Sequence, residues 1–288
     1  MTRRVITAVL LATMLVAVTG CVGSIGNTAL TPRLSPPVIA RPGNLRVAVD
    51  MSYPPFAGKV ASETVGLDVD VAAAIADQLG LKLELFDAKP QAAAALVQSG
   101  TVDIVLGALT VDSAVSQQVA FAGTYVSDAP TLFVSKDSTV SLPASASADA
   151  TGLLAAIADK RVAVQQGSLA YWVLLDSVGD SNLRVVTTLD DAFRSVATGN
   201  ADFVAGDALI GSYMLRTYPD FSYAGQLGSA YPLGVGCSQS NAKLESEVRT
   251  ILDKLASQGV LQTLRRKWVG DLTPLKVDSP SLNASGTP

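Results

Sequence analysis

Apolar positions recur along residues 45–271 with two alternating periods. Short apolar runs such as LRVAVD (45–50) end at an aspartate or glycine, and amphipathic segments follow them. In DVAAAIADQLG (70–80), Val71, Ile75 and Leu79 recur every fourth residue and Gly80 closes the predicted helix. The pattern continues as a strand over LKLELFD, a helix over QAAAALVQSG and a strand buried on both faces over VDIVLGAL. Strands that alternate with helices predict the α/β class.

The second half repeats this order. Strands are predicted over RVAVQQG, LRVVTTLD and ADFVAGDA, and helices over SLAYWVLLDSVG and DAFRSVATGN. A long amphipathic helix follows near 244–255, and the segment GVLQTLRRKWVG comes after it. Two such sheets place the carboxyl ends of their strands at a shared crevice, which is where open α/β sheets bind ligands.

Composition excludes several kinds of site. The 288 residues contain no histidine, so Ser-His-Asp catalysis, Cys-His catalysis and His-ligated zinc are excluded, and we expect no metal. The net charge of −4 argues against a nucleic-acid surface. Neither GxGxxG nor GxxxxGK[ST] occurs, so no nucleotide cofactor is expected.

The N-terminus has the pattern of an export signal. Arg3 and Arg4 precede the apolar run VITAVLLATMLVAV, and Thr19-Gly20 supplies small residues before Cys21. The sequence VTGC resembles a bacterial lipobox, in which the cysteine is lipidated and becomes the first mature residue. The alternative is an ordinary signal peptide with an accidental cysteine. We predict a lipoprotein signal over 1–20 and lipidation at Cys21.

The segments that flank the body are polar and lack apolar periodicity. Residues 21–43 are rich in Gly, Ser, Thr and Pro, which predicts a flexible tether, and residues 272–288 predict a loose tail. The second cysteine, Cys237, is predicted to be a small buried hydrophobe.

Seven segments, in order, resemble the family 3 extracellular solute-binding proteins, the amino-acid-type receptors of bacterial ABC importers. They cover about 45–271 and read LRVAVDMSYPPF, GLDVDVAAAIADQLG, LVQSGTVDIVLGALT, QQVAFAGTYV, KRVAVQQGS, ATGNADFVAGD and LASQGVLQTLRRKWVG. The resemblance implies a two-lobe periplasmic-binding-protein-like fold of type II, each lobe a mostly parallel sheet flanked by helices, joined by two crossover strands. Lobe 1 would comprise 44–134 and 226–271, and lobe 2 would comprise 135–225.

The same resemblance implies a receptor and not an enzyme. A monomer anchored at the extracytoplasmic face of the membrane would close its hinge on an amino acid or a related amine and deliver it to ABC permease and ATPase subunits. No cofactor or nucleic acid is expected.

Site residues of lobe 1 follow from the matching motifs. Asp50 and Tyr53 would flank the amino end of the ligand, although Asp50 could instead cap the turn and Tyr53 could be a rim aromatic. Gly107, Ala108 and Thr110 match the segment that grips a carboxylate through backbone N–H groups and a hydroxyl.

The segment 135–225 of lobe 2 and the strand that leads back to lobe 1 contain the other candidates. Gln165, Ser168 and Leu169 lie at a strand-to-helix junction that suits an anion, although Ser168 could simply cap the helix. Asp207 matches the acidic residue that pairs with the ligand ammonium. Tyr231 could line the crevice or pack at the hinge.

One departure from the family pattern bears on the ligand. Members usually carry a carboxylate-binding arginine five residues beyond the position of Thr110, and Val115 stands there in this chain. Three interpretations stay open. The ligand lacks an α-carboxylate and binds through Asp207 and Asp50, or Lys89 supplies the missing cation, or the amides near Ser168 and 107–110 suffice.

Two other functions compete with an importer component. Cyclohexadienyl dehydratases share this fold, and turnover of prephenate or arogenate would identify one. A receptor that senses a ligand without transport is the other alternative, which the neighbouring genes would distinguish.

Overall fold

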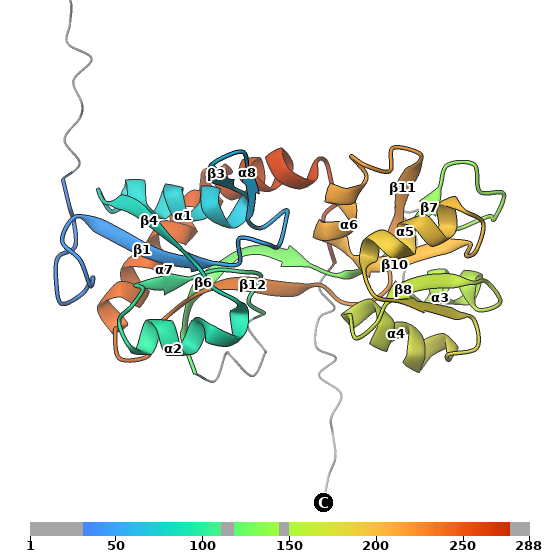
Figure 1. The fold of residues 1–288 in the computed structure, drawn as a ribbon, viewed down its shortest axis with the longest axis horizontal. Coiled ribbons are helices and arrows are strands. Elements are labelled where there is room, and N and C mark those ends of the chain that lie inside the picture. Colours follow the sequence, from blue (N-terminus) through green and yellow to red (C-terminus); the bar gives the residue numbers. More distant parts are fainter. Residues whose placement is uncertain (1–30, 111–117, 144–149, 277–288) are drawn as a thin grey trace, which may run out of the picture. The chain divides into compact units, whose positions relative to one another are not determined.

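The computed structural model describes residues 31–110, 118–143 and 150–276, all within one compact unit that begins at Thr31. These residues form two five-stranded sheets and a two-stranded ribbon, with helices packed on the sheets (Figure 1). The α/β class predicted from the alternating periods is confirmed.

The first sheet has the order β4-β1-β5-β12-β6, and the second has the order β11-β7-β10-β8-β9. The strands of the first sheet are β1 (Asn44–Val49), β4 (Lys82–Asp87), β5 (Ile104–Val105), β6 (Ala120–Asp128) and β12 (Tyr231–Cys237). Those of the second are β7 (Pro130–Ser135), β8 (Val162–Gln165), β9 (Leu183–Val186), β10 (Phe203–Asp207) and β11 (Phe221–Gln226). The ribbon pairs β2 (Gly58–Val60) with β3 (Glu63–Val65).

Both sheets are mixed, which corrects the expectation of mostly parallel sheets. In the first sheet β1 runs parallel to β4 and β5, whereas β12 runs antiparallel to β5 and β6. In the second, β8 runs parallel to β9 and β10, whereas β7 runs antiparallel to β10 and β11. The antiparallel neighbours are the strands on either side of the two passages between sheets, where the chain does not return through a helix.

Helices cover both faces of the first sheet because strand side chains alternate between faces. Val47 and Val49 of β1 face the core formed with α1 (Leu67–Gln78), α7 (Ala242–Ser257) and α8 (Val260–Val269). Ala48 faces the opposite core with α2 (Ala93–Gln98), which follows a 3₁₀ turn over Pro90–Ala92. Figure 1 shows α1 and α2 on opposite faces. The apolar face predicted for α7 is buried, at Leu244, Val248, Ile251 and Leu255.

The second sheet is covered in the same way. Leu132 and Phe203 pack with α3 (Ala150–Ile157) and α4 (Leu169–Val178). Phe133 and Val204 face the other side, toward α5 (Leu189–Ala197) and α6 (Ala208–Met214). A Cβ on Gly211 of α6 would lie 2.2 Å from the Phe133 ring, so only glycine lets this helix approach the sheet so closely.

The chain passes between the sheets twice, from β6 to β7 across Ala129 and from β11 to β12 across 227–230. Both passages place functional candidates at strand ends, because β6 ends at Asp128 and β12 begins at Tyr231. The division into two lobes at 134/135 and 225/226 stays a prediction.

Segments expected to be loose partly pack against the first sheet. Within the predicted tether, Leu34 and Ile39 are buried in the core, and the Ala40 N–H donates to Asp103 at 2.7 Å. Leu272 is also buried, and the Ala230 N–H donates to the Lys276 carbonyl at 2.9 Å. The predicted bounds of the tether and the tail therefore include residues that pack against the folded body. Cys21 and the signal segment lie outside the described residues.

Gly66 precedes α1, at a position where the neighbouring backbone leaves no room for a side chain. Its φ is 153°, and a Cβ there would lie 2.0 Å from the Phe56 carbonyl oxygen. The turn that carries Tyr53 and Phe56 is thereby packed directly on the start of α1. At the other edge of the core, Cys237 is fully buried as predicted, and burial raises the pKa of its thiol to about 11.

Candidate functional site

A cavity of about 440 Å³ lies where strand ends of both sheets meet. Its lining combines three aromatic rings, two of them phenols, with aliphatic groups, one threonine hydroxyl and two carboxyl groups: Tyr53, Phe56, Ala108, Thr110, Asp128, Leu169, Asp207, Tyr231 and Leu233. Six of the residues that the sequence singled out are among them. Asp50, Gly107, Gln165 and Ser168 are not.

Asp50 is committed to a neighbouring lysine. It ends the buried run of β1, and its carboxylate accepts hydrogen bonds from Lys89 Nζ at 2.9 Å and Ser52 Oγ at 2.7 Å. Burial raises the pKa of Asp50, but the bonds from Lys89 and Ser52 outweigh it and hold the pKa below its usual value. The bonds to Ser52 are those of a turn cap, the alternative role noted for Asp50, and Lys89 has its own counter-ion.

Tyr53 and Phe56 form the aromatic part of the lining. Their rings stack with centroids 5.5 Å apart, and the turn is closed by the Phe56 N–H donating to the Tyr53 carbonyl at 3.0 Å. Tyr53 is 38% exposed, so its ring is available to a ligand. Burial and the charges of Asp207 and Asp128 raise the pKa of its phenol, which keeps it neutral.

The 107–110 segment turns sharply at the end of a short strand. The strand predicted over 102–109 forms ladder pairs only at Ile104–Val105, because Gly107 and Ala108 take φ values of 113° and 54°. Ala108, a non-glycine residue in the left-handed region, lines the cavity.

Asp68 of α1 holds this segment from behind. Its side chain is fully buried, and Tyr125 donates its hydroxyl to Asp68 Oδ1 at 2.6 Å. The pKa of Asp68 is raised to about 6. Burial raises it, and hydrogen bonding from Tyr125 and from the backbone N–H groups of Gly107 and Ala108 offsets only part of that rise.

Ser168 caps α4. Its hydroxyl accepts the Tyr171 N–H at 3.1 Å and donates to the Gln165 carbonyl at 2.9 Å. The capping role expected for Ser168 is confirmed, and Leu169 alone of this junction reaches the cavity, with 43% of its surface exposed.

Asp207 and Tyr231 meet at the cavity as hydrogen-bond partners. The Tyr231 hydroxyl donates to Asp207 Oδ1 at 3.3 Å. Burial raises the pKa of Asp207, and the bond from Tyr231 only partly offsets it. Both residues sit at strand ends, Asp207 at the end of β10 and Tyr231 at the start of β12.

Asp128 is the acidic cavity residue that sequence reasoning missed, along with the apolar Phe56 and Leu233. It ends β6, only 3% of its surface is exposed, and it lies opposite Tyr231 in the β6–β12 pairing. Burial, followed by the charge of Asp207, raises its pKa to about 8. The sequence carried no clear signal for it, because its hydrogen-bond partner Leu209 lies far along the chain.

Across 31–110, 118–143 and 150–276, no lysine or arginine forms an ion pair with Asp128 or Asp207. The sequence between Lys89 and Lys136 contains no basic residue, so residues 111–117, which include Val115 and lie outside the described part, supply none either. Among the described residues, the cavity therefore has no basic side chain to offset its two carboxyl groups, and its negative charge is reduced at neutral pH because Asp128, whose pKa is raised to about 8, holds a proton.

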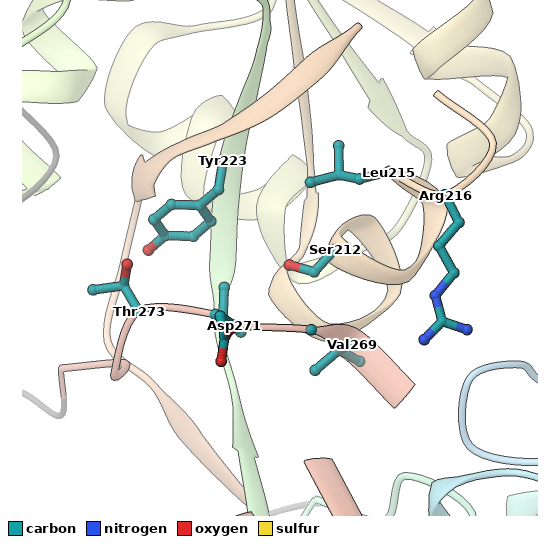
Figure 2. Close-up of a pocket in the computed structure, with 9 residues that line it drawn as sticks. Ser212, Leu215, Arg216, Tyr223, Val269, Asp271 and Thr273 are labelled. Carbon is teal, nitrogen blue, oxygen red and sulfur yellow. The ribbon is translucent and has the colours of Figure 1, made fainter. Parts of the chain in front are cut away.

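A second cavity, of about 340 Å³, lies between α6, β11 and the segment after α8 (Figure 2). Its charged groups already have partners. Arg216 donates to the Lys267 carbonyl at 2.8 Å, and Asp271 pairs with Arg266 at 2.7 Å. Arg216 and Tyr223 lie at opposite ends of this cavity in Figure 2, and they do not converge on a common point. We assign it no ligand.

The described part of the chain contains no cluster of three or more His, Cys, Asp or Glu side chains that could hold a metal ion. None of its helices is long and apolar enough to span a bilayer.

Comparisons with known proteins agree with this geometry. Residues 45–271 match the profile of the bacterial extracellular solute-binding proteins, family 3. The putative ABC transporter arginine-binding protein 2 of Escherichia coli K12 is 24% identical over 78% of this chain and 90% of its own length. The histidine-binding periplasmic protein of Salmonella typhimurium is 22% identical over 80% and 88%.

Solved structures show the same fold. An ancestral cationic amino acid solute binding protein superposes with a TM-score of 0.69 at 25% identity, covering 79% of this chain and 96% of that one. The unliganded, open L-cystine solute receptor of Neisseria gonorrhoeae gives a TM-score of 0.67 at 21% identity, covering 79% and 93%. The predicted two-sheet fold of the type II periplasmic binding proteins is thereby confirmed. Because the match spans nearly the whole described body, the chain belongs to the bacterial extracellular solute-binding proteins of family 3, as a solute-binding protein of the amino-acid ABC transporter type.

Proposed function

We propose that this protein is a lipid-anchored receptor that captures an amine-bearing small solute outside the cytoplasm and delivers it to an ABC importer. Its relatives include proteins named for binding arginine and histidine, which supports a solute with a cationic nitrogen. Cys21 would carry the lipid, and the permease and ATPase subunits would be the partners. The receptor would act as a monomer.

The observation that carries the amine assignment is the charge of the cavity. Asp128 and Asp207 both line it, and no lysine or arginine of the described residues lines it with them. A buried carboxylate is costly unless a positive group pairs with it. An ammonium or guanidinium group would supply that pairing, whereas a free ligand carboxylate would meet like charge.

Some lining residues would make polar contacts with the solute, and others would form the apolar walls of the cavity. Asp207 would accept from the cationic nitrogen, and Tyr53 would offer its ring face to the same charge. Thr110 would offer a hydroxyl, while Ala108, Leu169 and the Tyr231 ring would form the walls. Asp50 is not carried into this site, because Lys89 occupies it. Gly107, Gln165 and Ser168 would shape the site from outside its lining.

Closure would proceed by rotation at the two passages between sheets. Only two short connections, across Ala129 and across 227–230, join β6 to β7 and β11 to β12. Hinges of this kind need changes of backbone dihedrals at only a few residues. Asp128 and Tyr231 adjoin these connections, so closure and ligand contact would be coupled.

A thermal-shift screen tests the proposal. Amino acids, polyamines, quaternary amines and small sugars would be screened with purified protein, because a solute that binds only the folded state raises Tm by mass action. We expect hits among compounds with a cationic nitrogen, and Asp207→Ala should abolish the response to them. A protein that responds only to sugars or to nothing would contradict the proposal.

An enzyme on the same fold is the second candidate. One similar structure is described as a precursor of cyclohexadienyl dehydratase, at 26% identity and a TM-score of 0.58, and a buried aspartate with a raised pKa suits a general acid. The substrates of such an enzyme, prephenate and arogenate, carry carboxylates, which the carboxyl groups of Asp128 and Asp207 in this cavity disfavour. Turnover of either compound would establish the enzyme.

A receptor that senses its ligand without transport is the third candidate. It would use the same cavity and the same closure. Permease and ATPase genes beside the gene for this protein would favour the importer component, and their absence would favour the sensor.

A further inference from the structure

Asp128 has an identifiable structural role at the start of α6. Its Oδ1 accepts the N–H of Ala129 at 2.8 Å and the N–H of Leu209 at 3.0 Å. Asp207 occupies the N-cap position of that helix but makes no side-chain cap bond. Asp128 therefore caps α6 from a neighbouring strand, which frees the Asp207 side chain for the cavity.

This arrangement brings two carboxylates to one place. Asp128 and Tyr231 are cross-strand partners, and Tyr231 donates its hydroxyl to Asp207. All three side chains line the same cavity. A helix cap needs only an acceptor oxygen, which asparagine or serine supplies equally well, so capping does not explain why a charged residue stands at position 128.

The titratable groups that face Asp128 offer it no positive charge. They are Asp207 at the end of β10, Tyr231 on β12, Tyr53 in the turn after β1 and Tyr125 on β6, and burial raises the pKa of all three tyrosines. The bonds from Ala129 and Leu209 engage one carboxylate oxygen, Oδ1. A second carboxylate on a cavity wall, beside the first and without a counter-ion, suits a positive ligand group that lies against both.

We propose that Asp128 is a second cation-binding carboxylate of the solute site, and that with Asp207 it selects organic cations whose positive charge is not offset by a free carboxylate. This inference rests on the proposed function and narrows its solute class to amines and guanidines, including diamines. A zwitterionic amino acid would bring its carboxylate close to two carboxyl groups with no guanidinium to receive it, whereas a cation bound against both would favour release of the proton that Asp128 holds below about pH 8. A diamine or guanidine brings only charge of the opposite sign.

Matched pairs of compounds that differ by one carboxylate test the selectivity. Calorimetric titrations at pH 8.5, above the value of about 8 to which burial and the charge of Asp207 raise the pKa of Asp128, would compare agmatine with L-arginine and 1,5-diaminopentane with L-lysine. In each pair we expect the compound without the carboxylate to bind at least about tenfold more tightly, which corresponds to about 1.4 kcal/mol. L-Arginine or L-lysine binding as tightly as its counterpart would overturn the inference.

Asp128→Asn separates charge from capping, because the asparagine side-chain oxygen can still accept the N–H groups of Ala129 and Leu209. We expect this variant to keep its fold by circular dichroism and to bind agmatine or 1,5-diaminopentane about tenfold or more weakly. Asp103→Asn is the matched control, since Asp103 is also buried and accepts two backbone N–H groups, those of Ala40 and Arg46, but lies outside the cavity. It should leave affinity unchanged.

The outcomes separate the two proposals. Unchanged agmatine and diamine affinity in Asp128→Asn would show that Asp128 is only a helix cap. Wild-type protein that binds amino acids but neither agmatine nor 1,5-diaminopentane would contradict the selectivity and leave the receptor function standing. Protein that binds nothing in the broad thermal-shift screen would contradict both.

Discussion

Lys89 Nζ lies 2.9 Å from Asp50 Oδ1, and this pair removes both residues from the list of free charges near the solute site. The sequence offered Asp50 as an anchor for a ligand ammonium and Lys89 as a replacement for the missing arginine. Each instead satisfies the other, with Ser52 bound alongside. The carboxyl groups that line the cavity without a positive partner among the described residues are therefore Asp128 and Asp207.

Removing the Lys89–Asp50 pair should leave solute binding almost unchanged. Lys89→Met breaks an ion pair whose lysine side chain is 62% exposed, so we expect a loss of about 1 kcal/mol or less in the free energy of unfolding. Affinity for the best hit of the screen, measured by calorimetry, should stay within about threefold of wild type. A tenfold or larger loss would mean that Lys89 contacts the solute after all.

Solute-free protein should lose stability as the pH rises toward 8. Burial and the charge of Asp207 raise the pKa of Asp128 to about 8, so between about pH 4 and pH 8 the folded protein holds a proton that the unfolded chain has released. The stabilisation is present at low pH and is lost as the pH rises through the folded pKa, with a slope of at most about 1.4 kcal/mol per pH unit for one group.

Asp128→Asn isolates this contribution. Urea denaturation at pH 5.5 and pH 8.0 should show the variant gaining stability relative to wild type at the higher pH, because its side chain has no proton to lose. An equal difference between the two proteins at both pH values would contradict the buried, proton-holding state of Asp128.

The Tyr125–Asp68 hydrogen bond should contribute strongly to stability. Asp68 is fully buried, and its Oδ2 has no hydrogen-bond partner within the described residues, so Tyr125→Phe leaves the carboxylate with less support. We expect a loss of about 1–3 kcal/mol, and a Tm lower by several degrees in a protein of this size. The same substitution in an Asp68→Asn background is the control, and an equal loss there would mean that the bond is not the cause.

The alternating periods of the sequence predicted most helices and strands of the two sheets. They failed where local backbone geometry overrode them. VDIVLGAL predicts an eight-residue strand, yet pairing stops after Val105 because Gly107 and Ala108 turn with positive φ. Composition likewise predicted a tether through residue 43, although Ile39 is completely buried.

The sequence predicted only those site residues whose position depends on a nearby strand. Tyr53, Thr110 and Asp207 could be placed from motifs because each follows a predicted strand. Asp128 could not, because its role depends on a helix 80 residues later in the chain, whose Leu209 N–H it accepts. Similarly, no periodicity could show that Asp50 and Lys89 would neutralise each other across two neighbouring strand ends.

Anchoring at Cys21 can be tested in cells. Wild-type protein should fractionate with the membrane, and Cys21→Ala should either remain unprocessed or appear in the soluble extracytoplasmic fraction, because one lipidated residue would supply the attachment. Mass spectrometry of the mature N-terminus gives the direct readout. A mature wild-type chain that begins at a residue other than Cys21, with no lipid, would contradict the anchor.

A crystal structure with the tightest-binding solute tests the central claim most directly. We expect the cationic nitrogen within hydrogen-bonding distance, about 2.7–3.2 Å, of carboxylate oxygens of both Asp128 and Asp207. A solute bound by a carboxylate against an arginine or lysine, or bound outside this cavity, would contradict it.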